Sequence, residues 1–231
     1  MKGIMAIFAA LAISLTACAG DQTPTTDQAG VDASLPLERQ MRDAITAANA
    51  ELVRDLLAAG LAVDADLGSG ATALHLAVGA GDAGIVELLL AAGSPTEART
   101  QSGETPLHLA AADASGAVVR LLIAAGADPE APNPDFRNNA PLHYASRTGN
   151  TEAALALLAA GVDADQLTGT HSTALIIAAY NGRLETANAL LKHGVDTEVR
   201  DDVGKTALDW AIAQGHPDVA AAIETAAGGE D

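Results

Sequence analysis

Pairs of large aliphatic residues recur along the chain inside alanine-rich runs. The pairs are Leu56–Leu57, Leu89–Leu90, Leu122–Ile123, Leu157–Leu158 and Leu190–Leu191. A glycine follows each pair, and these glycines, at positions 60, 93, 126, 161 and 194, are spaced by 33, 33, 35 and 33 residues. Each run therefore predicts a helix that is anchored by the aliphatic pair and ended by a glycine in the left-handed C′ conformation.

A second alanine-rich run lies ahead of most of these helices and begins with a short polar motif. The motif reads "SGATALHLA" from Ser69, "SGETPLHLA" from Ser102, "NNAPLHYA" from Asn138, "HSTALIIA" from His171 and "VGKTALDWA" from Val203. Threonine before the run suits a helix N-cap, and proline suits the first helical position. We expect a helix here whose Leu and Ala residues face the core, with N-caps at Thr72, Thr105, Thr173 and Thr206.

The 33-residue period and the T-P-L-H motif resemble ankyrin repeats. The resemblance implies an all-α solenoid of about six stacked helix-turn-helix repeats with protruding hairpin loops. It covers residues 37–228, with repeats at about 37–65, 66–98, 99–131, 132–166, 167–199 and 200–228. A single repeat cannot bury its apolar face alone, so stability requires stacking of neighbours.

The N-terminus has the layout of a secretory signal peptide over residues 1–17: one positive charge at Lys2, then an apolar run. Its end, "LTAC", resembles the lipobox of bacterial lipoproteins, which implies that Cys18 carries the lipid. The absence of Asp after Cys18 favours the outer membrane, facing the periplasm. Residues 18–36 read as a disordered linker. The alternative is an ordinary signal peptide and an unmodified thiol at Cys18.

The formal net charge of −18 changes the range of partners. It argues against nucleic acid, because binding to phosphates needs a basic surface. It favours a protein partner with a basic or mixed surface, although a high net charge also serves solubility alone. No motif for a nucleophile, a metal or a phosphate-binding loop is present. We therefore expect a monomeric, non-enzymatic protein that has neither a cofactor nor a metal.

Two recurrent polar positions have a structural and a functional interpretation. The motif histidines, His75, His108 and His143, are expected to form hydrogen bonds between repeats, as the resemblance implies. An acidic residue stands four positions after each glycine. These residues, Asp64, Glu97, Glu130, Asp165 and Glu198, either brace the hairpins or form an acidic edge for a basic partner or divalent cations.

Aromatic residues beyond the signal peptide are confined to the last three repeats. Aromatic and arginine side chains are typical interface anchors. By the resemblance, the first helices line a concave groove. The expected partner-binding residues there and in the nearby loop are Phe136, Arg137, Tyr144, Arg147, Tyr180, Asn181 and Trp210. The alternative is that some of them only fill the core.

The sequence thus predicts a protein-protein interaction module tethered to the bacterial cell envelope. It would bind its partner through the concave helix face and the loop tips. The alternative function is a periplasmic immunity protein that neutralises a delivered toxin.

Overall fold

The computed structural model describes residues 30–228. The expected signal peptide and Cys18 lie outside these residues. The helices are α1 (Leu37–Thr46), α2 (Ala50–Ala58), α3 (Ala73–Ala80), α4 (Ala83–Ala91), α5 (Pro106–Asp113), α6 (Gly116–Ala124), α7 (Pro141–Thr148), α8 (Thr151–Ala159), α9 (Ala174–Tyr180), α10 (Leu184–His193), α11 (Ala207–Gln214) and α12 (Pro217–Ala227). A short 3-10 helix, η1 (Pro134–Phe136), precedes α7. None of the helices within 30–228 has the length and apolarity needed to cross a membrane.

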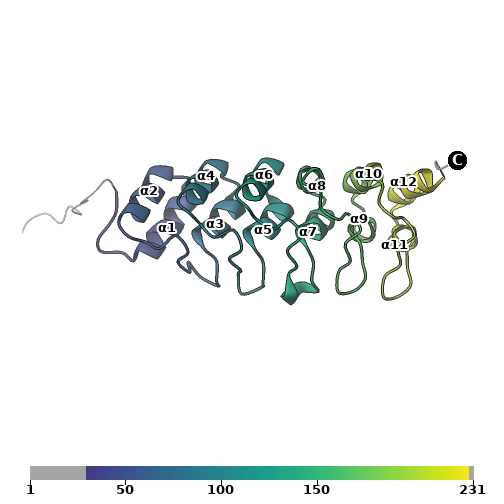
Figure 1. Cartoon of the computed structure of the whole chain (residues 1–231), viewed down its shortest axis with the longest axis horizontal. Coiled ribbons are helices and arrows are strands. Elements are labelled where there is room, and N and C mark those ends of the chain that lie inside the picture. Colours follow the sequence, from purple (N-terminus) through teal and green to yellow (C-terminus); the bar gives the residue numbers. More distant parts are fainter. Residues whose placement is uncertain (1–29, 229–231) are drawn as a thin grey trace, which may run out of the picture.

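The helices form two rows, with the odd-numbered helices in one and the even-numbered in the other (Figure 1). Each helix contacts the next member of its own row, and α1 to α12 pair successively into six hairpins. Long loops extend beyond the row of odd-numbered helices (Figure 1). This arrangement confirms the expected all-α solenoid of stacked helix pairs.

The starts of the first helices follow the motif, with one difference from the simple threonine cap. Thr173 Oγ1 accepts the backbone N–H of Ile176 at 3.3 Å, as expected. In the repeats that contain the motif histidine, the histidine ring joins the cap. His108 Nδ1 lies 3.2 Å from the backbone nitrogen of Thr105 and 2.8 Å from its hydroxyl. The histidine therefore fixes the first turn of its own helix.

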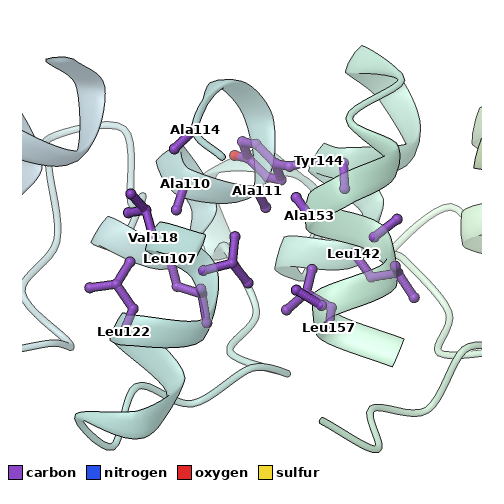
Figure 2. Packing of buried hydrophobic residues seen from close by; sticks show 14 of the residues in the cluster. Leu107, Ala110, Ala111, Ala114, Val118, Leu122, Leu142, Tyr144, Ala153 and Leu157 are labelled. Carbon is purple, nitrogen blue, oxygen red and sulfur yellow. The ribbon is translucent and has the colours of Figure 1, made fainter. Parts of the chain in front are cut away.

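A single core runs along the solenoid between the two rows. The first member of each aliphatic pair is fully buried, and the second lies closer to the surface. Alanines such as Ala110 and Ala153 fill the space between helices, which lets the repeats approach closely (Figure 2). The glycine after each pair adopts the expected left-handed conformation, for example Gly161 with φ 85°.

The loops between repeats, which we call fingers, are hairpins with little regular strand structure. Within residues 30–228 the backbone pairing amounts to one isolated bridge, between Asn133 and Asn139. Neighbouring fingers are nevertheless tied together. Gln101 N donates to Ser69 O at 2.8 Å, and Asp202 N donates to Thr170 O at 3.2 Å. These bonds align the fingers side by side.

Residues 30–36 differ from the disordered linker that we expected over 18–36. Gln40 is buried in α1, and its amide nitrogen donates to the carbonyls of Asp32 and Leu35. Its amide oxygen accepts the backbone N–H of Asp32 at 2.8 Å. Val31 packs against the core. These bonds satisfy the buried amide of Gln40 and hold the backbone of Asp32 and Leu35 against α1.

Candidate functional site

A groove of about 460 Å³ lies beside the first helices and fingers of the last three repeats. We call it the aromatic groove. The predicted residues that line it are Phe136, Arg137, Arg147, Tyr180, Asn181 and Trp210. The groove therefore brings together six of the seven residues that the sequence suggested.

Tyr144, the seventh predicted residue, is not at the surface. Its side chain is only 2 % exposed and lies among the buried residues of α5 and α7 (Figure 2). Its ring meets His108 edge-on at 5.0 Å, and its hydroxyl accepts the Asn133 amide at 2.7 Å. Burial raises the pKa of the Tyr144 hydroxyl. We therefore correct its expected role: Tyr144 supports the groove from below instead of contacting a partner.

One wall of the groove is built on Tyr144. Phe136 stands at the end of η1, is 41 % exposed and meets the Tyr144 ring at 6.0 Å. The guanidinium carbon of Arg147 lies 4.9 Å from the centre of the Phe136 ring and 4.7 Å from that of Tyr144. These cation–π contacts fix the arginine at the surface. The spacing of 35 instead of 33 residues between Gly126 and Gly161 places two extra residues in this finger, which thus supplies a wall that the other fingers lack.

Asn133 organises the finger that carries this wall. It is fully buried; its amide nitrogen also donates to Ser102 O at 3.0 Å, and its amide oxygen accepts the backbone N–H of Asp135. Sequence reasoning missed this residue. It lies in "PNPDFRNN", where the prolines and asparagines indicate a turn but not which amide is buried.

The opposite part of the groove is an aromatic pair from α9 and α11. Tyr180 is 47 % exposed and meets Trp210 edge-on, with ring centres 5.0 Å apart. The indole nitrogen of Trp210 donates to Asp201 Oδ2 at 2.6 Å, and Lys205 Nζ lies 4.0 Å above the indole ring. The tryptophan is therefore held from two sides, while Tyr180 packs against its ring and leaves about half of its own surface exposed.

Between these walls, the fifth repeat contributes a polar finger. Thr168, Thr170 and Ser172 line the groove there, together with Ile177. The hydroxyls of Thr168 and Thr170 lie 3.1 Å apart. His171, at the tip, pairs with Asp202 of the next finger. The sequence did not single out these hydroxyl residues, because serine and threonine are common in turns and loops.

The motif histidines have the expected structural role. Nε2 of His75 lies 3.2 Å from Glu104 O, that of His108 3.1 Å from Asn139 O, and that of His143 2.9 Å from Gln166 O. Each bond therefore joins one repeat to the next. Burial lowers the pKa of His75 and His143, and it lowers that of His108 to about 4. These neutral rings are structural, and they lie outside the groove lining.

The acidic column braces the turns between repeats. The backbone N–H of Asp128 donates to Glu97 at 3.0 Å, and that of Asp163 donates to Glu130 at 2.6 Å. Asp196 N–H donates to Asp165, whose pKa is raised by burial. Residues 30–228 contain no cluster of three or more metal-ligating side chains. The bracing interpretation thus accounts for the central members of the column.

Comparison with known families agrees with this geometry. A family model described as ankyrin repeats (3 copies) matches residues 41–133, 94–168 and 142–225. The chain belongs to the ankyrin-repeat family. No curated protein sequence gives a significant match to this ankyrin-repeat protein. Ankyrin repeats are generally protein-protein interaction modules and are typically non-enzymatic, which directs attention to the exposed side chains of the groove.

Proposed function

We propose that this ankyrin-repeat protein binds a protein partner through the aromatic groove, using both the first-helix face and the finger tips. The observation that carries the proposal is the exposure of Phe136 and Tyr180 beside Arg147 in one groove. Fewer than one residue in forty of the chain is aromatic, yet three of these aromatic residues, Phe136, Tyr180 and Trp210, line this groove. Exposed aromatic and arginine side chains in a recess are the usual anchors of protein interfaces.

The rigidity of the scaffold supports the same proposal. Hydrogen bonds between fingers and the stacked Arg147 hold the groove in one shape before binding. A preformed surface loses less conformational entropy when it binds. The side chains that would anchor a partner therefore lose little conformational entropy when they bind it.

We propose further that the protein is tethered to the bacterial envelope by a lipid on Cys18, at the outer membrane and facing the periplasm. The sequence "LTAC" supports this proposal. Growth with a labelled fatty acid tests it: label should enter the wild-type chain and be absent from Cys18→Ser. Equal labelling of the two chains, or no labelling of either, would refute the tether.

A capture experiment tests the proposed binding site. The full chain, produced without lipid processing and attached to a support through Cys18, serves as bait for an envelope extract. The groove variant combines Phe136→Ala, Arg147→Ala and Tyr180→Ala. The matched control combines Leu155→Ala and Lys192→Ala, which alter a hollow on the outer helices α8 and α10.

We expect one protein to be captured by the wild type and the outer-face control but lost with the groove variant. Circular dichroism should give the same helix content for all three baits. Equal capture by all three would move the site away from the groove. If the captured protein proved to be a toxin delivered from another cell, the immunity function would replace the scaffolding one.

A further inference from the structure

Arg137 and Arg147 are the cations that line the aromatic groove, and neither has an acidic partner. Lys205 lies above the Trp210 ring at the other end but does not belong to the lining. Within residues 30–228, carboxylates lie within 4.0 Å of only Arg39, His171 and Arg200. The nearby Arg99 differs, because its guanidinium donates to the carbonyls of Gly103 and Pro132. Most arginines within residues 30–228 lack a carboxylate at this distance, so Arg137 and Arg147 differ from the others by lining the same groove.

The chemistry of these arginines favours a carboxylate. A guanidinium is planar and can donate two parallel hydrogen bonds to a carboxylate. Arg147 is already stacked against Phe136 and Tyr144, so it loses little freedom on binding. Arg137 sits in the left-handed region at φ 55°, and Gly169 N donates to its carbonyl at 2.5 Å, which fixes its backbone.

The groove is also polarised along the solenoid axis. The two arginines belong to the repeat of α7, and Asp201 and Asp202 belong to the finger before α11. The repeat of α9 lies between them (Figure 1). Asp201 and Asp202 would repel a second acidic group at that end. The ligand therefore needs a carboxylate at one end only, and the net charge of −18 opposes polyanions such as nucleic acids or anionic membranes.

We propose, resting on the proposed function, that the aromatic groove recognises a short extended segment of a partner protein. An Asp or Glu of that segment binds Arg137 and Arg147, and a neighbouring large apolar side chain packs on Tyr180 and Trp210. The arginines and the aromatic pair lie in different repeats along the groove, and their positions determine the order of the acidic and the apolar residue in the partner segment.

Selection from random dodecapeptides displayed on phage tests the proposal with the full chain as the target. We expect the enriched peptides to carry one Asp or Glu within a few residues of an aromatic or large aliphatic side chain. The best peptide and its Asp→Asn or Glu→Gln version are then compared by fluorescence anisotropy. Loss of the charge should weaken binding by about tenfold or more.

Three variants locate the carboxylate. Arg147→Gln and Arg137→Gln should each lower the affinity for the acidic peptide. Each should also reduce the ratio between the affinities for the acidic and the neutral peptide. Arg120→Gln removes an exposed arginine from the outer helix α6. It should change neither the affinity for the acidic peptide nor the ratio of the two affinities. If Arg120→Gln lowered the affinity as much as the two groove variants do, the dependence on charge would come from the protein surface as a whole. That result would overturn the proposal.

The remaining outcomes separate this proposal from the proposed function. The enriched peptides could lack acidic residues and yet fail to bind the Tyr180→Ala protein. That result would support the groove as the binding site but overturn its specificity for a carboxylate. Absence of any enriched peptide would overturn recognition of a short segment. The capture experiment would then still decide whether the groove binds a folded partner.

Discussion

At the scale of the residue, the ring of the motif histidine forms a hydrogen bond to the start of its own helix and another to the next repeat. Nδ1 of His108 accepts the backbone N–H of Thr105, so its proton must reside on Nε2, which donates to Asn139 O. Protonation of Nδ1 would break the first of these bonds inside the core. Burial accordingly lowers the pKa of His108 to about 4, from an ordinary value of 6.5.

This shift predicts loss of stability in mild acid. The folded state binds the proton more weakly than the unfolded state, so the stabilisation is complete above pH 6.5 and decreases as the pH falls towards 4. From His108 alone, the free energy of unfolding should fall by about 2 kcal/mol between pH 7.5 and pH 5. His75 and His143 act in the same direction.

Urea unfolding at the two pH values measures this effect. The control is His108→Gln, which has no titrating ring and should lose about 2 kcal/mol less than the wild type over the same interval. An identical decrease in both proteins would show that His108 does not remain neutral in the fold.

The hydroxyl of Tyr144 provides a second test at this scale. It accepts a hydrogen bond from the buried amide of Asn133, so Tyr144→Phe should destabilise the protein by about 1 kcal/mol. Tyr180→Phe is the matched control, because Tyr180 is exposed and its change should stay within about 0.5 kcal/mol. Chemical denaturation compares the two, and equal values would contradict the supporting role of Tyr144.

At the scale of the element, each helix pair depends on its neighbours. Leu122 of α6 is fully buried, whereas Leu155 of α8 has the same side chain and is 52 % exposed. The helices α6 and α8 contact each other in the outer row. Loss of a core side chain should therefore weaken the adjacent repeats as well as its own.

We expect Leu122→Ala to lower the free energy of unfolding by about 2–5 kcal/mol, because it leaves a cavity in the core. Leu155→Ala should cost less than about 0.5 kcal/mol. Thermal unfolding followed by circular dichroism compares them. Hydrogen exchange in the Leu122→Ala protein should rise in α4, α6 and α8 before the terminal repeats; a uniform rise would contradict coupling to nearest neighbours.

At the scale of the whole molecule, the dominant feature is the net charge of −18 on an extended scaffold. Glu97, Glu130 and Asp165 each brace the following turn, which places their carboxylates on successive repeats. Like charges repel across the surface, and the repulsion weakens as salt shortens the screening length.

Salt should therefore stabilise the protein. Raising the KCl concentration from about 0.01 to 0.1 M shortens the screening length from about 30 to about 10 Å. We expect the melting temperature to rise, by about 2–4 °C for each kcal/mol of repulsion removed. Differential scanning calorimetry measures this change. A fall in melting temperature would mean that favourable ion pairs outweigh the repulsion.

The sequence by itself determined the repeat, the helix pairs and the buried leucines. Each of the four central repeats carries its own capping residues, aliphatic pair and terminating glycine, so local chemistry recurs about every 33 residues and is visible without any fold. It also indicated most of the groove, because Phe136 and Tyr180 stand out in a chain with few aromatics, and Arg147 lies between them in the sequence.

Only the tertiary structure decided which of these side chains face a partner. Tyr144 and Tyr180 both lie on first helices, yet Tyr144 is covered by the finger that carries Phe136 and Asn133, and Tyr180 is not. Likewise, the bond between Asp163 N–H and Glu130 joins residues 33 positions apart and defines the acidic column as a brace. Such contacts arise when repeats stack, so no single repeat specifies them.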